Sequence, residues 1–545
     1  MPKLPFLCSL LFAAVGVAGD ASGKADAAPD LILHNGTIFT GDPAQPRAQA
    51  LAIRGERIVA VGDDEAIAAL AGVDTRRIDL DGRRVVPGIN DAHEHLGWHP
   101  PEGTLLTLAW PEPTGADLDA ALKAQPADGE GWIRGEIGAG VFNDPDWNIA
   151  RLDALHPSRP VLLWMFTSHG LLLNTAAQRA LGVDPAIEIP GGWYGRDAGG
   201  TFDGRLYEYA PWRVMTRRPL PSDDAALEQL RQYGDEVLKL GITSVQTMAW
   251  IPPAQFVALW RRSGAPQRVR VIRFPMQGTP DQPIDGADLP RQVAGAPKIE
   301  VSGTKWILDG TPVDQNAALR LPYPGSDREG RLNFAPTRIE ALVREILARD
   351  DQPMLHVSGD ATAAAVFDAL EAIAPPAEWR ARRVRLEHGD GLAPDLLGRA
   401  AGFGIVVVQN PSHFMVADDH PFAVLVRERD FQPLSGLLDA GIALALGSDG
   451  PRNPWLNLQF AAAPATRPDQ ALTREQALRA YTEGSAFAEF REHEKGRLAP
   501  GYLADLAVLS QDVLDEAAVP LQELPKTVSM LTVIGGEIVW RDPAF

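Results

Sequence analysis

The chain has 545 residues, of which 45% are hydrophobic, and a formal net charge of −20. This length and composition allow a sizeable core, enough for a barrel with one further small domain. The acidic balance, without a block of lysine or arginine, argues against nucleic acid or an anionic membrane as the main partner, because both bind clustered positive charge.

The first 27 residues are typical of a signal peptide. Lys3 precedes the apolar run LPFLCSLLFAAVGVA, and cleavage is expected after Ala18 or Ala27. The run is too short to span a bilayer comfortably, so no stable membrane anchor is expected. The single cysteine, Cys8, lies inside this segment, so the mature chain would have neither a disulfide nor a thiol nucleophile. We expect a periplasmic or secreted protein; the alternative is a cytoplasmic protein that keeps an apolar extension.

Short alternating strands are expected at both ends of the remaining chain. LILHNGTIFT, AQALAIRGERIVAVG and RRIDLDGRRVVPG alternate apolar and polar residues between glycine-containing turns, and DLAVLSQDV and TVSMLTVIGGEIVW repeat the pattern near the C-terminus. Two strand-rich ends predict one small β-sandwich built from residues 28–86 and 493–545.

The middle of the chain, residues 87–492, alternates strand-like runs with helical stretches such as RIEALVREILARD. This α/β pattern predicts a parallel sheet closed as a (β/α)8 TIM-like barrel. Nine runs compete for eight strands, and we assign VLLWMFTSH (161–169) to a long insertion of about residues 96–235. Active sites of such barrels lie at the C-terminal ends of the strands, so we expect this insertion to stand over the mouth as a lid and substrate wall.

Six residues at the ends of strand-like runs indicate a metal site: His93, His95, Lys305, His356, His388 and Asp449. Because side chains alternate along a strand, His93 and His95 point to the same side. Two histidines on one strand are often only polar neighbours. Four histidines, a lysine and an aspartate at successive strand ends favour a metal site instead. Imidazole and carboxylate ligands favour zinc or another divalent ion.

This order of residues resembles the amidohydrolase superfamily, and most of all its family 3, which includes N-substituted formamide deformylases. In that family an HxH motif ends the first barrel strand, lysine the fourth, single histidines the fifth and sixth, and aspartate the eighth. The chain matches all six positions. SHGLLLNTAAQRALGV, RLEHGD, VVVQNPSH and KGRLAPGYLADLAVL also fit, so the resemblance extends over roughly residues 30–541. It implies the barrel, the β-sandwich and a metal-dependent hydrolase.

The resemblance further implies two divalent metal ions bridged by a carboxylated Lys305, with zinc favoured. A lysine ammonium cannot bind a cation, whereas its carbamate can. The more buried ion would be held by His93, His95 and Asp449, and the outer ion by His356 and His388. A hydroxide shared by the ions would be the nucleophile, because metal binding lowers the pKa of water toward about 7. Asp449 is the expected catalytic residue, taking the water proton and passing it to the leaving amine.

Three further residues are candidate substrate contacts: His169 in TSHGLLLN, Gln315 in DGTPVDQNA and His413 in QNPSH. Many relatives in this family carry an arginine where Gln315 stands, so we expect a neutral substrate rather than an acidic one. Large aromatic surfaces in the insertion favour an apolar or aromatic substrate group, although they could instead pack the insertion against the barrel. The tryptophans concerned are Trp98, Trp110, Trp132, Trp147, Trp164, Trp193 and Trp212.

Carboxylates beside these motifs are expected to have structural roles. Glu94 lies on the strand face opposite His93 and His95, where a hydrogen-bonding role is favoured. Glu208 and Asp360 match family motifs, and a capping or loop-bracing role is as well supported as a catalytic one.

The leading interpretation is a metal-dependent hydrolase that cleaves a C–N bond in an amide, N-formyl or cyclic amide substrate. A heterocycle deaminase is the alternative on the same fold, but VSGD follows His356 where mononuclear deaminases place a glutamate. A non-catalytic metal-binding protein is the third option, and the intact ligand set argues against it. The sequence contains no GxSxG motif, so nothing indicates the nucleophilic serine of a Ser/His/Asp triad. The sequence leaves the oligomeric state open, with a homo-oligomer as one option.

Overall fold

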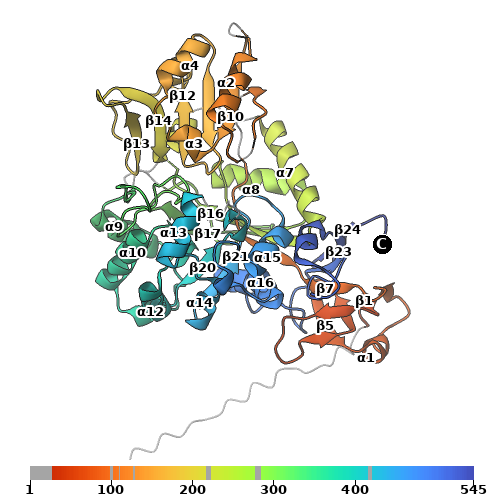
Figure 1. The fold of residues 1–545 in the computed structure, drawn as a ribbon. Helices are drawn as coiled ribbons and strands as arrows, with labels where there is room; N and C mark the ends of the chain where they lie inside the picture. Colours follow the sequence, from red (N-terminus) through yellow and green to blue (C-terminus); the bar gives the residue numbers. More distant parts are fainter. Residues whose placement is uncertain are drawn as a thin grey trace, which may run out of the picture.

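The computed structural model describes residues 28–97, 102–109, 111–126, 129–216, 222–276, 284–414 and 420–545. The expected signal peptide over residues 1–27 lies outside these ranges, as do Trp98 and Trp110. The described chain folds as a barrel with a separate sheet above it and a β-sandwich beside it (Figure 1). No described helix is long and apolar enough to cross a membrane.

Eight parallel strands form the barrel, and they pair in chain order. They are β8 (Ile89–Glu94), β15 (Ile242–Met248), β16 (Arg268–Arg273), β17 (Ile299–Ile307), β18 (Pro353–Val357), β19 (Arg385–His388), β20 (Val406–Gln409) and β21 (Ala443–Leu446). Runs such as VVVQ in β20 and ALAL in β21 are almost wholly buried, as expected for parallel strands covered on both faces. The last and first strands meet where the Asp449 backbone N–H donates to the His93 carbonyl at 2.9 Å.

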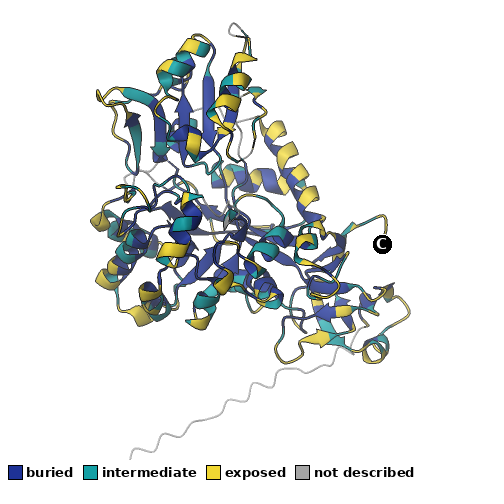
Figure 2. Ribbon diagram, viewed as in Figure 1, coloured by how far each residue is buried: buried dark blue, intermediate teal, exposed yellow. Residues whose placement is uncertain are grey.

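Helices surround the barrel with one face buried and the other exposed (Figure 2). In α9, for example, Ile339, Leu342, Val343 and Ile346 recur at helical spacing and are all buried. The helices of this layer are α7 (Asp223–Leu238), α8 (Pro253–Ser263), α9 (Pro336–Ala348), α10 (Asp360–Ile373), α11 (Pro376–Trp379), α12 (Pro394–Phe403), α13 (Pro421–Arg429), α14 (Leu434–Asp439), α15 (Pro454–Ala462), α16 (Arg474–Arg479) and α17 (Ser485–Ala488).

The two ends of the described chain build the β-sandwich together. One sheet has the order β5-β4-β1-β6 and the other β24-β23-β22-β7-β2-β3. The strands are β1 (Leu31–His34), β2 (Thr37–Phe39), β3 (Arg47–Ala48), β4 (Ala50–Arg54), β5 (Arg57–Gly62), β6 (Arg76–Asp79), β7 (Arg84–Pro87), β22 (Leu506–Leu509), β23 (Ser529–Ile534) and β24 (Glu537–Arg541), with helix α1 (Asp64–Ala68) beside them. In the second sheet Val85 of β7 lies in register with Val508 of β22. This pairing of distant segments makes the sandwich a composite of both termini.

Between β8 and β15 the chain forms a six-stranded sheet of its own, above the barrel in Figure 1. Its order is β13-β14-β12-β11-β10-β9. The elements are β9 (Gly103–Leu105), β10 (Trp132–Ile137), β11 (Val161–Met165), β12 (Gly170–Leu173), β13 (Gly192–Arg196) and β14 (Phe202–Glu208), with α2 (Gly115–Lys123), α3 (Ala139–Phe142), α4 (Ile149–Leu155), α5 (Thr175–Ala180) and α6 (Tyr209–Thr216). The run that competed for a barrel position, residues 161–169, therefore belongs to the insertion.

Candidate metal centre

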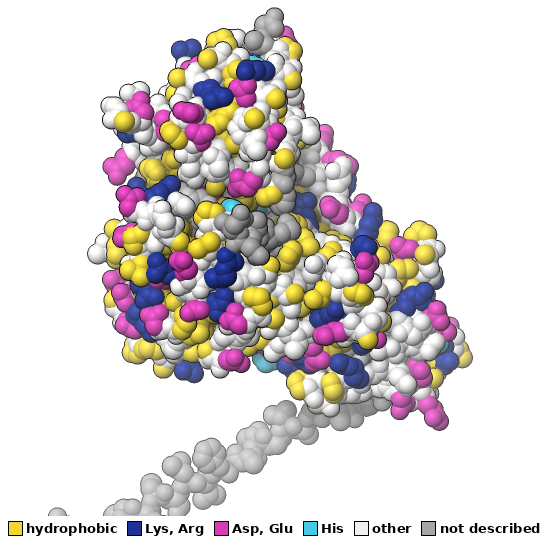
Figure 3. Space-filling model, viewed as in Figure 1, with side chains coloured by type: hydrophobic (Ala, Val, Ile, Leu, Met, Phe, Trp, Pro, Cys, Tyr) yellow, Lys and Arg dark blue, Asp and Glu magenta, His cyan; other side chains and the backbone are white. Residues whose placement is uncertain are grey.

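The six residues singled out from the sequence all lie at one end of the barrel. Each belongs to a parallel strand or to the turn that follows it, and the carboxyl ends of such strands meet at one mouth. Four of the six are almost wholly buried, whereas the side chains of His95 and Asp449 are 17% and 20% exposed to solvent. Histidine atoms reach the surface at the junction between the insertion and the barrel (Figure 3).

His93, His95 and Asp449 form a first group of converging ligand atoms. The Nε2 atoms of both imidazoles lie 3.6 Å from Asp449 Oδ1. Lys305 Nζ lies between them, 2.9 Å from His93 Nε2 and 3.5 Å from His95 Nε2. Two imidazole nitrogens and a carboxylate oxygen within 4.8 Å of one another can surround a single divalent ion.

A second group shares Asp449 with the first. His388 Nε2 lies 3.6 Å from Asp449 Oδ2, and His413 Nε2 lies 2.8 Å from the Asp449 backbone carbonyl. The structure thus places His413, expected as a substrate contact, beside the ligands; it belongs to the 3-10 helix over Pro411–Phe414. The His356 ring packs against His388, with ring centroids 4.5 Å apart, while its Nε2 lies 3.3 Å from Ser358 Oγ.

Buried partners fix the orientation of the first two histidines. His93 Nδ1 lies 2.7 Å from Glu387 Oε2, and Arg385 Nε donates to the other oxygen of that carboxylate at 2.8 Å. His95 Nδ1 lies 2.9 Å from the Met248 carbonyl. With each Nδ1 occupied, Nε2 is the nitrogen directed toward Asp449, the arrangement that second-layer partners of metal-bound histidines produce.

Burial also sets the protonation of the cluster. It lowers the pKa of His95 to about 4 and holds the pKa values of His93, His356 and His388 well below their ordinary value. Neutral imidazole is the form that binds a metal. Burial alone would raise the pKa of Asp449, but the charges of nearby histidines and Lys305 outweigh it and lower that pKa to about 2. The set is therefore four neutral imidazoles and an ionised carboxylate, which suits a divalent cation.

Residues 76–540 match the model of the family described as "Amidohydrolase family". The chain belongs to the amidohydrolase family. It is 28% identical over 546 residues to putative amidohydrolase YtcJ of Bacillus subtilis, covering 94% of this chain and 99% of that one. It is 27% identical over 536 residues to N-substituted formamide deformylase of Arthrobacter pascens, with 91% and 96% covered. Protein LONG AFTER FAR-RED 3 of Arabidopsis thaliana is 28% identical over 543 residues, with 93% and 91% covered.

Solved structures share the fold of this amidohydrolase at lower identity. An uncharacterized metal-dependent hydrolase from Pyrococcus horikoshii superposes with a TM-score of 0.66 at 21% identity, over 89% of this chain and 98% of that one. Atrazine chlorohydrolase TrzN from Arthrobacter aurescens, complexed with zinc, gives a TM-score of 0.52 at 18% identity, over 94% and 95%. Family membership together with the cluster identifies a metal-dependent hydrolase with a metal cofactor and a small-molecule substrate.

The insertion of this amidohydrolase contributes His169 to the centre. The His169 ring is buried, with its centroid 4.9 Å from that of His356, and its Nδ1 lies 2.9 Å from Glu208 Oε2. Glu208, for which a bracing or capping role and a catalytic role were both open from the sequence, is thus the partner of a histidine at the candidate metal centre. Sequence reasoning missed this pairing, because the two residues are 39 positions apart and meet only when β12 and β14 pair.

Gln315, the third expected substrate contact, lies in the turn after β17 and is half-buried. Its neighbour Asp314 makes the contact to the insertion, accepting from Thr167 Oγ1 at 2.8 Å. Within the described part of the chain, the Gln315 side chain makes no hydrogen bond to the six clustered residues.

Several non-glycine residues around the centre have left-handed backbone conformations. Such positive φ angles are uncommon outside glycine and gather at functional sites. The residues are Ser168, Glu208, Gln315, His388 and Asp449, with φ between 44° and 70°. The turns that present the site are therefore held by tertiary contacts.

An aromatic wall stands beside His95. The centroids of Trp250 and Phe274 lie 5.4 and 5.6 Å from the His95 ring, and Trp212 of the insertion lies 5.9 Å from Phe274. Of the insertion tryptophans, for which substrate contact and packing were both open, Trp147 lies in the insertion's own core. Sequence reasoning missed Trp250 and Phe274, although they lie two residues and one residue after the ends of β15 and β16, where the strand-end rule could have found them.

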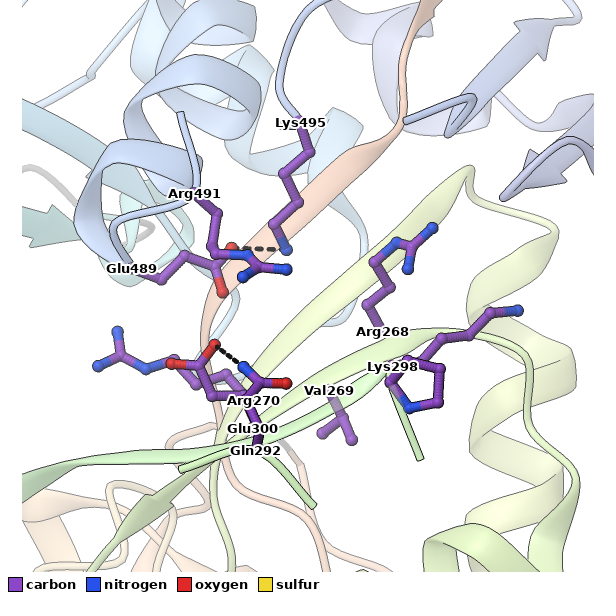
Figure 4. A pocket seen from close by; sticks show the side chains of 10 residues that line it. Arg268, Val269, Arg270, Gln292, Lys298, Glu300, Glu489, Arg491 and Lys495 are labelled. Carbon is purple, nitrogen blue, oxygen red and sulfur yellow. Dashed lines mark hydrogen bonds and ion pairs between the residues drawn. The ribbon is translucent and has the colours of Figure 1, made fainter. Parts of the chain in front are cut away.

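A separate hollow lies near the amino ends of β16 and β17 (Figure 4). The candidate metal residues lie at the opposite, carboxyl ends of the strands. Its volume is about 20 Å³, room for about one water molecule. Charges on its wall pair with one another, as in the 2.6 Å contact between Lys495 Nζ and Glu489 Oε1. This hollow is a braced part of the barrel floor and does not enter the proposed chemistry.

Proposed function

We propose that this amidohydrolase hydrolyses the C–N bond of a neutral amide-type substrate, such as an N-substituted formamide, an amide or a cyclic amide. The observation that carries the proposal is the pair of ligand groups that share Asp449, with Lys305 buried between two imidazole nitrogens. The likeness to N-substituted formamide deformylase of Arthrobacter pascens supports the same reaction class.

Two metal ions, with zinc favoured, fit the residues present. His93, His95 and Asp449 would hold one ion, and His388 and His356 the other, with His413 close to the second. Imidazole and carboxylate are the ligands expected for zinc, and burial keeps the imidazoles neutral.

Lys305 suits a bridging role once it is carboxylated. Lys305 is 1% exposed, and its Nζ lies 2.9 Å from His93 Nε2, so an ammonium here would be buried against imidazole nitrogens. Burial lowers the pKa of Lys305 to about 8, so the neutral amine that reacts with CO2 is accessible near neutral pH. Carboxylation would replace the positive charge of the Lys305 side chain with an anionic carbamate, whose two oxygens can bind metal.

When bound, the ions would lower the pKa of water toward about 7 and polarise the substrate carbonyl. Asp449, ionised and partly exposed, would accept a proton from the attacking water. It would return that proton to the departing nitrogen as the C–N bond breaks, so that an acid and an amine leave. Glu387 and Met248 would keep His93 and His95 oriented throughout.

Specificity for an apolar or aromatic substituent is supported by Trp250 and Phe274, which flank His95. Such rings bury a large apolar area around a ligand. Gln315, in place of an arginine, would remove the fixed cation that attracts a carboxylate.

The test is a panel of amides, N-substituted formamides, cyclic amides and amino-substituted heterocycles, assayed before and after removal of metal. The proposal expects metal-dependent release of an amine from a neutral amide, with weaker cleavage of a matched substrate that carries a carboxylate. Release of ammonia from heterocycles alone would support the deaminase alternative. A metal-loaded, folded protein that cleaves no member would favour a non-catalytic metal-binding protein.

A further inference from the structure

His169 and Glu208 form a buried pair where the insertion meets the barrel. His169 lies just before β12, and Glu208 ends β14, so both come from the insertion sheet. Glu208 is fully buried and His169 is 7% exposed. The insertion supplies both side chains, because neither residue belongs to a barrel strand.

Glu208 also connects the insertion to the strand that carries Lys305. Its Oε2 accepts from Asn333 Nδ2 at 3.0 Å, and the same Asn333 nitrogen donates to the Ile307 carbonyl at 3.2 Å. The next residue, Tyr209, accepts from the Ile307 backbone N–H at 2.9 Å through its hydroxyl. The position of the Glu208 carboxylate is thus tied to the end of β17.

Contacts on several sides fix the orientation of the His169 ring. Nδ1 donates to Glu208, one face packs near His356, and Trp212 lies against the ring with centroids 5.5 Å apart. The preceding residues are held as well, because Trp212 Nε1 donates to the Ser168 carbonyl at 3.0 Å. Among the described residues, no hydrogen bond occupies His169 Nε2, the ring nitrogen opposite the one that Glu208 holds.

We propose that Glu208 is a positioning residue that holds His169 so that its Nε2 hydrogen-bonds the amide group of the substrate at the metal centre. This inference rests on the proposed amide hydrolysis and deepens it. The insertion is then a working part of the active site, since it supplies a substrate contact in addition to covering the mouth.

A double-mutant cycle on kcat/KM tests the proposal, with wild type, Glu208→Gln, His169→Gln and the double variant. Glu208→Gln keeps the volume and an acceptor oxygen but removes the charge. If Glu208 acts only through His169, we expect a loss of about tenfold in the wild-type background and less than about twofold in the His169→Gln background, since small misplacements of a substrate contact cost up to about a hundredfold. Equal losses in both backgrounds would overturn the proposal.

Asp203→Asn is the matched control. Asp203 lies on the same strand, and its carboxylate pairs with Arg205 at 2.7 Å inside the insertion. We expect this variant to stay within about twofold of wild type in kcat/KM. A loss as large as that of Glu208→Gln would assign the effect to the insertion as a whole. A Glu208→Gln protein with a lower Tm and less metal, but unchanged kcat/KM in its loaded fraction, would show a purely structural role.

The His169–Glu208 hydrogen bond can also be detected directly, without an activity assay. In metal-free protein labelled with ¹⁵N-histidine, NMR is expected to show an Nδ1 proton shifted to low field by the Glu208 carboxylate. This signal should vanish in His169→Gln and move in Glu208→Gln. Its absence from the wild type would refute the pair whatever the substrate. An inactive wild type that shows the signal would refute only the proposed reaction.

Discussion

Asp449 is the residue on which the two ligand groups meet. One carboxylate oxygen lies 3.6 Å from both His93 Nε2 and His95 Nε2, and the other lies 3.6 Å from His388 Nε2. Its turn is held by Asp91, which accepts hydrogen bonds from both the backbone N–H and the hydroxyl of Ser448. A side chain fixed in this way, yet still partly exposed, can contact both metal ligands and substrate.

Replacing Asp449 by asparagine should therefore separate catalysis from folding. The amide keeps the shape and one oxygen for a metal but cannot accept the water proton. Proton transfer by a positioned group contributes roughly 10²–10⁴-fold, and a fall of that size in kcat is expected. The measurements are kcat, metal content and Tm. Activity within a few-fold of wild type would remove Asp449 from the base role.

Trp250 should determine preference for the substrate's substituent. Its ring forms the aromatic wall with Phe274, at a centroid distance of 5.8 Å. Trp250→Ala is expected to lower kcat/KM for a formamide with a phenyl-bearing substituent by about 10–100-fold, and much less for one with a short alkyl substituent. Trp379→Phe, at the buried tryptophan that ends α11 and precedes the amino end of β19, serves as the control. Equal losses of kcat/KM on both substrates would mean that the substituent does not bind against Trp250.

At the level of elements, much of the candidate site could be predicted from the residues at the ends of the strand-like runs. An aspartate or histidine that closes an apolar run must reach the mouth of a parallel barrel, so the six clustered residues could be found without coordinates. Contacts that depend on how distant strands pair could not. Arg385 and Glu387 stand in the RLEHGD segment, but their ion pair and its link to His93 require β19 and β8 to face each other across the barrel.

A further prediction concerns the joint between the two ends of the chain, where β7 pairs with β22 in the sandwich. Arg84 of β7 donates to Asp512, which follows β22, through Nε at 2.7 Å and through Nη2 at 2.5 Å. The Arg84 side chain is 7% exposed, so Asp512→Ala would leave a largely buried guanidinium without its carboxylate. We expect a loss of about 1–3 kcal/mol in the free energy of unfolding, with kcat unchanged in the folded protein. Urea unfolding measures this; an unaltered midpoint would mean that the bidentate pair does not stabilise the joint.

At the scale of the whole molecule, the barrel provides the candidate metal ligands and the insertion lies over that end of the barrel. The composite sandwich lies to the side and leaves the mouth to the insertion (Figure 1). The long insertion could be predicted from an excess strand between two barrel strands. Its own six-stranded sheet could not, because β13 (GWYGR) and β14 (FDGRLYE) mix glycine, charged and aromatic residues without a regular strand alternation, and their pairing is set by the neighbouring strands.

Export is a whole-molecule prediction from the N-terminal sequence. We propose that the apolar run after Lys3 directs the chain out of the cytoplasm and is then removed. Expression in a bacterial host should yield, in the periplasmic or secreted fraction, a protein whose first residue follows Ala18 or Ala27. Intact mass and fractionation measure this. A full-length chain confined to the cytoplasm would favour the alternative of a retained extension.

The proposed reaction depends on a two-metal centre built from the barrel residues and a carboxylated lysine. Elemental analysis of purified protein at full specific activity gives the number of metal ions per chain. We expect about two divalent ions in the wild type and a loss of at least one in Lys305→Met, since the bridging carbamate is removed. One ion or fewer per chain in fully active wild-type protein would contradict it.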